Sequence, residues 1–261
     1  MWWRNMNICI DVGNSTIGIG AFKDNKLVER MVVNTDPRFT EDEFYQLFKK
    51  TFAFMVNNDR IENIIFSSVV PQVNVSLLSA LAMLTDVKPI LIGPGTKTGL
   101  SIKVDNPMEI GNDLIADLVG AKEKYGYPCI IADLGTASKI LLLDNNGTFV
   151  SCLIMPGLTL SAESLSNKAA LLPEVSLIAP NSILAKNTLG AMNAGIVYGH
   201  ADMILGLIRR IEKEIGYSCK HILTGGGATY IKEIVNDEFI YDKDLNLNGL
   251  NIIINKNIKE K

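Results

Sequence analysis

The residues best suited to chemistry form two short polar stretches, each placed where an apolar, strand-like run ends. Asp11 ends the run Ile8–Asp11 and opens the stretch DVGNST, and Asp133 ends the run Cys129–Asp133 and opens DLGTAS. A carboxylate at the end of a buried strand costs free energy unless it has a partner. A metal ion or a phosphate brought in by a ligand is the functional partner that this placement suggests, and carboxylate oxygens suit magnesium.

The two stretches are copies of one pattern. ICIDVGNSTIGIGAF at 8–22 matches IIADLGTASKILLLD at 130–144, and too few residues follow each Asp-x-Gly for a helix, so each copy predicts a β-hairpin. Glycine lets backbone N–H groups converge and a phosphate approach closely. Two such hairpins facing a cleft can hold a polyphosphate from both sides, although an ordinary turn explains either one alone. Side chains that can add hydrogen bonds to phosphate are Asn14, Ser15, Thr16, Thr136 and Ser138.

The stretch HILTGGGATYI at 221–231 is a third candidate, because a strand runs into three glycines and then a helix. Backbone without side chains can approach a flat ligand at the carboxyl end of a strand. The stretch is not GxGxxG, and GxxxxGK[ST] is absent from the chain, which disfavours a dinucleotide fold or a P-loop. A turn that merely needs glycine is the alternative.

A glycine-rich segment at 93–122 leads into a helix that we expect to begin near Asn112–Asp113. Asp113 and Asp117 are four residues apart and therefore share one face of this helix. Asp113 is suited either to cap the helix or to act as a general base towards a substrate hydroxyl. Spacing alone favours the cap.

The elements that position these residues alternate between strands and helices, which indicates an α/β fold. Thr40 and Glu43 predict a capping box at the first helix. The repeat predicts two related domains, 1–126 and 127–261, with a boundary near 125–128 and the last helices packing back across it. The expected strands are Ile8–Asp11, Ile17–Phe22, Ile64–Ser67, Pro89–Ile92, Cys129–Asp133, Lys139–Leu143 and His221–Thr224. The expected helices are Glu41–Asn57, Val75–Leu84, Asp113–Tyr125, Gly190–Ile215 and Tyr230–Val235.

Composition bounds the function further. The 261 residues are 48% apolar and 20% charged, as in ordinary globular proteins, and a net charge of −3 without a basic run argues against nucleic acid as a partner. No apolar run reaches the length of a membrane span and no signal peptide is visible, so we expect a soluble cytoplasmic protein without a membrane partner. Met6 is an equally natural start, so Met1–Asn5 need have no part in the fold. The four scattered cysteines (Cys9, Cys129, Cys152, Cys219) suggest small core residues in a reducing compartment.

Taken in order, these segments resemble the type III pantothenate kinases, members of the acetate kinase/sugar kinase/Hsp70/actin superfamily. The resemblance runs from Met6 to about Ile254. It is carried by IDVGNST, ADLGTAS, TGLSIKVDNPMEIGNDLIAD, PGLTLSAESLSNKAALLP at 156–173, KNTLGAMNAGIVYG at 186–199, TGGG and LNLNGLNII at 245–253.

The resemblance implies two duplicated actin-like (ribonuclease H-like) domains with a nucleotide cleft between them. It implies a kinase that transfers the γ-phosphate of ATP to the primary alcohol of pantothenate, the first step of coenzyme A biosynthesis. The expected cofactors are ATP with Mg²⁺ and a monovalent cation, K⁺ or NH₄⁺. The expected assembly is a homodimer with the substrate pocket near its interface.

The resemblance also assigns roles to residues. Asp113 is the catalytic base, Asp11 faces the magnesium–phosphate group, and Asp133 helps to hold the monovalent cation. The nucleotide-binding residues are Asp11, Val12, Gly13, Asn14, Ser15, Thr16, Gly18, Gly135, Thr136, Ala137, Gly225 and Gly226. The substrate-binding residues are Val104, Gly111, Asn112, Asp113, Leu114 and Thr188.

The sequence departs from the family pattern at the substrate end. Leu114 replaces an arginine, which removes a bidentate donor for a carboxylate, and Val104, beside Lys103, replaces a tyrosine. Ser151–Cys152 replaces a pair of glycines. Lys139 replaces a hydroxyl residue, and its ammonium is expected either in solvent or near the cation site or phosphates, where it would replace the monovalent cation.

These departures leave two alternatives to a pantothenate kinase. The first alternative is a paralogous kinase that phosphorylates another small alcohol, such as a sugar, a polyol or a hydroxy-amino compound. The second is a nucleotide-binding regulator that has lost catalysis. The intact Asp113 argues against the regulator, whereas the missing arginine keeps it open.

Overall fold

The computed structural model describes residues 5–56 and 59–258, which divide into two compact units. Of the described residues, the first unit contains 5–56, 59–100, 106–120 and 245–258, and the second contains 101–105 and 121–244. The expected division into 1–126 and 127–261 differs from these units at residues 101–105, 121–126 and 245–258, although the last helices were expected to pack back across the boundary. Residues 245–258 belong to the first unit, because the last helix packs on its sheet.

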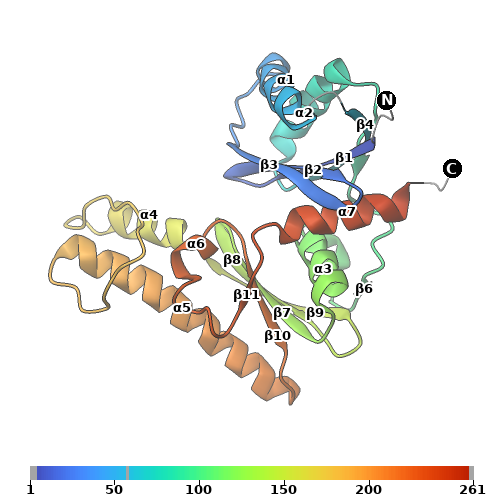
Figure 1. Ribbon diagram of the computed structural model, residues 1–261. Helices are drawn as coiled ribbons and strands as arrows, with labels where there is room; N and C mark the ends of the chain where they lie inside the picture. The colour runs from blue at the N-terminus through green and yellow to red at the C-terminus, as the bar shows by residue number, and fades with distance from the viewer. Residues whose placement is uncertain (1–4, 57–58, 259–261) are drawn as a thin grey trace. The chain divides into compact units, whose positions relative to one another are not determined.

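The first unit contains a five-stranded sheet in the order β3-β2-β1-β4-β5. The bounds are β1 Asn5–Val12, β2 Thr16–Lys23, β3 Lys26–Asn34, β4 Arg60–Ser68 and β5 Ile90–Leu91. β1, β2 and β3 form an antiparallel meander, whereas β4 and β5 continue the sheet in parallel. Helices α1 (Glu41–Val56) and α2 (Pro71–Leu84) cover one face, and α7 (Leu245–Asn257) covers the other (Figure 1).

Strand alternation decides what each face of this sheet carries. Met6, Ile8 and Ile10 pack into the core beneath α1 and α2. Asn7 points the opposite way and is hydrogen-bonded to α7. Because side chains two residues apart share a face, Asp11 lies on the α7 face with Asn7.

Helix α3 (Asn112–Tyr125) begins in the first unit, and its last turn belongs to the second. It packs against α7 through glycines. A Cβ on Gly249 would overlap the carbonyl oxygen of Ala116, and a Cβ on Gly120 would lie 2.6 Å from the carbonyl oxygen of Leu245. The two backbones therefore approach closely at a crossing where only glycine fits.

The second unit repeats the topology of the first. Its sheet has the order β11-β10-β7-β8-β9-β6, in which β7, β8 and β9 form the antiparallel meander and β10 and β11 run parallel to β7. The bounds are β6 Ser101–Ile102, β7 Cys129–Leu134, β8 Ala137–Leu143, β9 Thr148–Pro156, β10 Lys220–Thr224 and β11 Ile240–Tyr241. The shared strand order supports the duplication expected from the sequence repeat.

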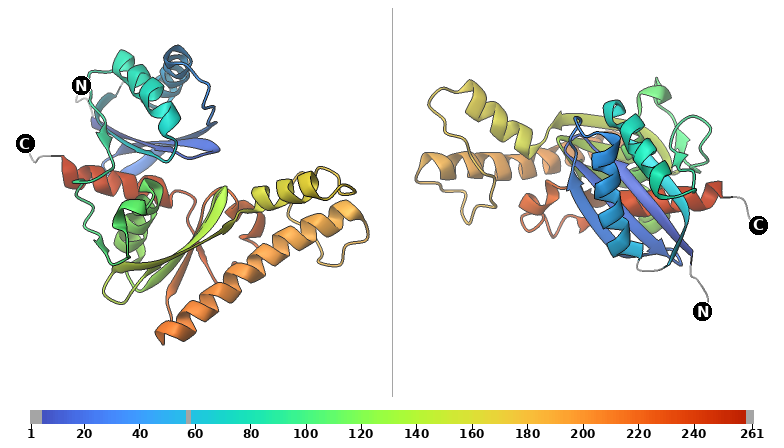
Figure 2. Two further views of the ribbon diagram at one scale, coloured as in Figure 1. Left: turned by 180° about the vertical axis from the view of Figure 1, so that it is seen from behind. Right: turned by 90° about the horizontal axis from the view of Figure 1, so that it is seen from above.

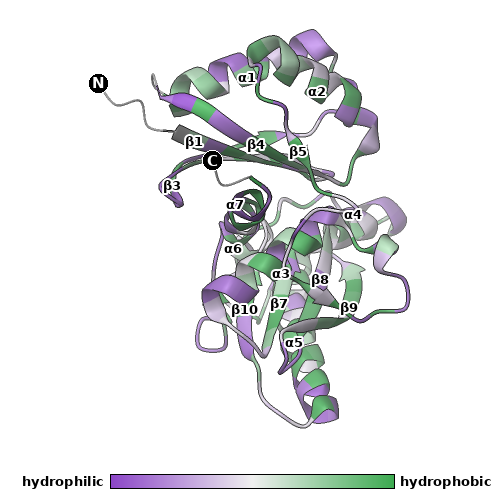
Figure 3. Ribbon diagram, turned by 90° about the vertical axis from the view of Figure 1, so that its right-hand side faces the viewer, coloured by the Kyte–Doolittle hydropathy of each residue, from purple (hydrophilic) through white to green (hydrophobic). Residues whose placement is uncertain are grey.

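The helices of the second unit are α4 (Leu158–Lys168), α5 (Thr188–Ile215) and the short α6 (Ala228–Ile231). Among the described residues, α5 alone is long and apolar enough to cross a membrane, by length and composition only. A search of the sequence for uninterrupted apolar runs does not detect this helix, because polar residues interrupt it. Figure 3 shows hydrophobic and hydrophilic residues alternating along this helix. Its residues Val197, Ala201 and Ile204 are buried in the core of the second unit.

Most of the expected elements are confirmed. All seven strands and the helices at α1, α2, α3 and α5 are present within a few residues, although Asn57 lies outside the described residues. The helix expected at Tyr230–Val235 is wrong in extent, because α6 ends at Ile231 and turns follow. The Thr40–Glu43 capping box is confirmed by reciprocal hydrogen bonds, with Glu43 Oε2 accepting from the N–H of Thr40 at 2.8 Å.

Candidate functional site

The predicted hairpin at Asp11 is formed by β1 and β2. The N–H of Gly13 donates to the carbonyl of Thr16 at 3.0 Å, which closes a turn whose residues Asn14, Ser15 and Thr16 are exposed. Thr35 holds this turn from outside, since its hydroxyl donates to the carbonyl of Gly13 at 2.7 Å. The turn thus presents an amide and two hydroxyls to solvent on a fixed backbone, as a phosphate-binding hairpin requires.

The candidate base lies near the carboxyl end of this hairpin's first strand. Gly111 is next to Val69, whose side chain would be 3.7 Å from a Cβ at position 111. The N–H of Val69 in turn donates to the carbonyl of Val12 at 3.0 Å. The structure therefore brings Gly111 and Asp113 close to the first hairpin within one unit.

The carboxylate of Asp113 rests on the first turn of α3. Its Oδ1 accepts from the N–H of Leu114 at 2.9 Å, and a Cβ on Gly111 would overlap this same oxygen. A negative charge at a helix N-terminus is stabilised by the unpaired N–H groups there. Asp113 is therefore both a local cap and a half-buried carboxylate, so the two roles that the sequence leaves open are compatible.

The second hairpin carries an ion pair. β7 and β8 are joined by the turn at Gly135–Thr136, and Asp133 is directly opposite Lys139 in the antiparallel register. Nζ of Lys139 lies 2.8 Å from Oδ2 of Asp133, and both side chains are mostly buried. The expectation of a solvated ammonium for Lys139 is therefore wrong, because cross-strand pairing directs its side chain onto the carboxylate.

The TGGG segment lies directly against this hairpin. β10 runs parallel to β7 with Thr224 opposite Asp133. Gly225 has φ +87°, and a Cβ there would lie 2.6 Å from Oδ1 of Asp133. The N–H of Gly227 donates to the carbonyl of Leu134 at 2.7 Å. The second unit thus brings together Asp133, Gly135, Thr136, Ala137, Gly225 and Gly226.

A buried hydrogen bond between Ser138 and His200 connects the second hairpin to α5. Ser138, on the face of β8 opposite to Lys139, has its hydroxyl 2.8 Å from Nε2 of His200 in α5. Burial lowers the pKa of His200, so the imidazole is neutral at physiological pH. The hydroxyl that the sequence offers as a phosphate donor is thus fully buried and bonded to His200, which makes Ser138 an anchor and not a ligand.

The remaining predicted substrate residues of the second unit lie away from its hairpin. Val104 follows Lys103, whose N–H donates to Phe149 at the start of β9, whereas the hairpin turn contacts Gly157 just beyond the end of that strand. Thr188 begins α5, twelve residues before His200, which corresponds to about 18 Å along the helix axis. Figure 2 shows this end of α5 projecting beyond the sheet beside α4.

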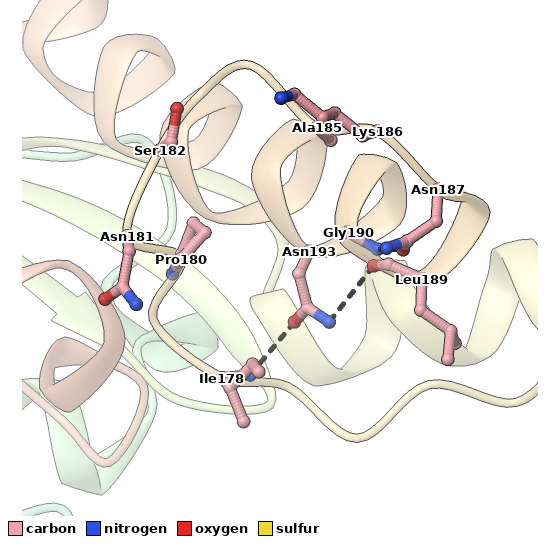
Figure 4. Close-up of a pocket in the computed structure, with 10 residues that line it drawn as sticks. All are labelled: Ile178, Pro180, Asn181, Ser182, Ala185, Lys186, Asn187, Leu189, Gly190 and Asn193. Carbon is pink, nitrogen blue, oxygen red and sulfur yellow. Dashed lines mark hydrogen bonds between the residues drawn. The ribbon is translucent and has the colours of Figure 1, made fainter.

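Thr188 adjoins a pocket of about 440 Å³ formed by the loop before α5 and the first turns of that helix (Figure 4). Asn193 organises the pocket, because its amide accepts from the N–H of Ile178 at 2.9 Å and donates to the carbonyl of Leu189 at 3.2 Å. Asn187 caps the helix through the N–H of Gly190. Lys186 also lines the pocket, so its wall is polar on one side.

Sequence reasoning missed two residues that shape these sites. Gly157 has no room for a side chain, since a Cβ there would overlap the carbonyl of Gly135, so it fixes the turn of the second hairpin. Asn246 of α7 donates to the backbone carbonyl of Asp113 at 3.1 Å. The Pro-Gly pair at 156–157 and the repeated asparagines of 245–257 were visible in the sequence, but their spatial partners were not.

Magnesium fits the first hairpin by its donor chemistry. Among the described residues no group of three or more Asp, Glu, His or Cys side chains has metal-binding geometry. Magnesium in nucleotide sites uses one or two carboxylates together with phosphates and water, and does not need such a group. Asp11, half-buried beside the exposed turn, offers one such carboxylate.

The sequence comparisons all match proteins of one family. A model of the family described as type III pantothenate kinase matches residues 7–210. The type III pantothenate kinase of Listeria monocytogenes serotype 4a (strain HCC23) is 37% identical over 253 residues, covering 97% of this chain and 98% of that protein. The type III pantothenate kinase of Bacillus cytotoxicus is 38% identical, covering 97% of each chain.

Comparison of structures gives the fold. A conserved putative Baf family transcriptional activator from Campylobacter jejuni aligns with a TM-score of 0.61 at 20% identity, over 96% of this chain and 98% of that one. A ROK family glucokinase from Streptomyces griseus, solved with glucose and AMPPNP, aligns with a TM-score of 0.51 at 13% identity, over 96% and 98%. The chain therefore has the actin-like fold of the sugar kinases, which confirms the predicted fold class.

Proposed function

Because this chain belongs to the type III pantothenate kinase family, we infer that it transfers the γ-phosphate of ATP to pantothenate, the first step of coenzyme A biosynthesis. The chemistry is phosphoryl transfer, in which the protein mainly positions the reactants and neutralises charge. The observation that carries this function in the structure is the position of Asp113, a half-buried carboxylate near the first phosphate hairpin.

In the first unit, the proposed roles follow the order of the hairpin. The turn Gly13–Thr16 binds phosphate oxygens through its N–H groups and exposed side chains, and Asp11 faces the magnesium that accompanies ATP. Asp113 accepts the proton of the substrate's primary alcohol as that oxygen attacks phosphorus. Magnesium, when bound, neutralises developing charge on the phosphates.

In the second unit, the turn at Gly135–Thr136 binds phosphate, and the glycines at 225 and 226 admit the nucleoside. The strained φ of Gly225 and its contact with Asp133 support this role, since a side chain there would push the loop off the end of β7. Gly157 supports the phosphate turn from behind through its N–H, which donates to the carbonyl of Thr136.

The acceptor is tested by measuring ADP release with pantothenate and with a panel of sugars, polyols and hydroxy-amino compounds. We expect pantothenate to give the highest kcat/KM and a product heavier by one phosphoryl group in mass spectrometry. Turnover with another alcohol and not with pantothenate would identify a paralogous kinase, as the replacement of arginine by Leu114 allows. Nucleotide binding without turnover on any alcohol would identify a regulator.

The residues around Asp133 do not fit a free monovalent cation, because the ammonium of Lys139 is already 2.8 Å from its carboxylate. We propose that Lys139 replaces K⁺ or NH₄⁺ in this chain. The wild type should then turn over equally in K⁺-free sodium buffer and in K⁺ buffer. Lys139→Ala should lose roughly 100-fold in kcat without K⁺ and recover part of it when K⁺ is added.

Lys213→Ala is the matched control, since it removes an exposed lysine from the same unit and should behave as the wild type. A wild-type enzyme that needs K⁺ would contradict the replacement of the cation. A Lys139→Ala variant with unchanged turnover in both buffers would contradict any role of the ammonium in the reaction.

We propose further that the enzyme is a cytoplasmic homodimer. Exposed apolar side chains follow one another along the loop before α5 and its first turn, and surfaces of this kind commonly mark interfaces. They are Leu171, Ile178, Ile183, Leu184 and Leu189. Thr188 lies among them, which supports a substrate pocket near the interface.

A further inference from the structure

Asn246 makes one hydrogen bond that connects α7 to the proposed catalytic base. Its Nδ2 donates to the backbone carbonyl of Asp113 at 3.1 Å, across 133 residues of sequence. Its Oδ1 is buried and has no hydrogen-bond partner among the described residues. The side chain therefore uses its donor and leaves its acceptor unsatisfied.

An unsatisfied buried oxygen is unfavourable for stability. A leucine of similar size at this position would remove the unsatisfied oxygen. Residues that leave a buried polar atom without a hydrogen bond occur preferentially at functional sites. The hydrogen bond to Asp113 is the compensating gain that the structure shows.

The helix that carries Asn246 is fixed firmly to the sheet. Asn251 accepts from Nδ2 of Asn7 in β1 at 3.2 Å, and Asn255 donates to Oδ1 of Asn25 at 2.6 Å. These contacts lie on the face of the sheet that also carries Asp11. Asn246 therefore connects the first turn of α3 to a helix held in place against the strand of the first hairpin.

The position of the Asp113 carboxylate is determined by the backbone at this turn. Its Oδ1 is bonded to the next N–H, of Leu114, and the space beside it exists because residue 111 is glycine. A shift of the Asp113 carbonyl moves the carboxylate with it. A displacement of about 1 Å at a reacting group is enough to lower turnover roughly 100-fold.

We propose that Asn246 is a positioning residue for catalysis, which holds the first turn of α3 so that the carboxylate of Asp113 meets the substrate hydroxyl. This inference rests on the proposed role of Asp113 as the base. It assigns a task to Asn246, the first asparagine of the LNLNGLNII segment, which the sequence resemblance left without one.

The test compares Asn246→Leu with Asn255→Leu in the full-length enzyme. For Asn246→Leu we expect kcat to fall about tenfold or more, the KM for ATP to stay within twofold, and the melting temperature to stay the same or rise. Amide hydrogen exchange should accelerate in peptides covering 111–117. Asn255→Leu, which lies nine residues further along α7, should lower the melting temperature and keep kcat within twofold of the wild type.

Unchanged hydrogen exchange at 111–117 in Asn246→Leu would overturn the positioning role, whatever the acceptor of the enzyme is. A parallel loss of melting temperature and kcat would also overturn it, since that result indicates a purely structural bond. The exchange readout needs no substrate, so a failure of the proposed function, seen as a wild type without pantothenate-dependent turnover, is distinguishable from a failure of this inference.

Discussion

Replacing Asp113 by asparagine should lower kcat by about 10²–10⁴-fold and leave the affinity for nucleotide unchanged. The amide keeps the size of the carboxylate and can still accept from the N–H of Leu114, so the turn of α3 should survive. It cannot take the proton of the attacking alcohol, and a positioned base contributes about that factor to turnover. The measurement is steady-state ADP release together with calorimetric titration of the nucleotide.

Glu123→Gln is the matched control for this variant. It removes an exposed carboxylate from the same helix, ten residues beyond the proposed base, and should leave kcat within twofold. Undiminished turnover in Asp113→Asn would remove this residue from the role of base. Lost nucleotide binding would instead show that the substitution disturbs the first hairpin.

Replacing Gly249 by alanine should give the largest loss of stability among single substitutions in the first unit. The new Cβ would overlap the carbonyl oxygen of Ala116, which is backbone and cannot rotate away, so α7 and α3 must separate. Overpacking of this kind costs about 3 kcal/mol. For a protein of this size, that corresponds to a fall in melting temperature of roughly 6–12 °C.

Gly206→Ala provides the comparison, because it is also a helical glycine but has nothing within 4 Å of its Cβ position. Alanine should stabilise α5 there by up to about 1 kcal/mol, as it does in helix interiors. Calorimetric melting of both variants measures the difference. Equal melting temperatures for the two would show that the α3–α7 crossing adjusts to a side chain, and that its close approach is not required.

The hairpins were predictable because their signals are local. Each β-hairpin is encoded within fifteen residues, by an apolar run, an Asp-x-Gly and a second apolar run. The repeat of this pattern predicts the repeated topology. Helix α7 was not expected as a helix, because its residues 245–257 are rich in asparagine and isoleucine, which have modest helix propensity. Its helical state depends on packing against β1 and α3, which no local pattern encodes.

The candidate site was also predictable only where its signals are local. The roles of Asp11, Asp113 and Asp133 follow from motifs, whereas the bond between Asp133 and Lys139 depends on strand register. That register was within reach, since a three-residue connection at 135–137 places residues 133 and 139 opposite each other. The contact of Asn246 with Asp113 joins residues far apart in sequence, so only the tertiary structure could reveal it.

The amides that attach α7 to its sheet have a consequence for how the enzyme responds to its surroundings. Asn7, Asn25, Asn63, Asn251 and Asn255 are joined by hydrogen bonds between side chains that carry no charge and do not titrate. Their attraction is therefore not screened by salt and does not change between acid and alkaline conditions. Activity measured across pH or ionic strength should thus report the carboxylates and the bound phosphates, and not a loosening of this helix.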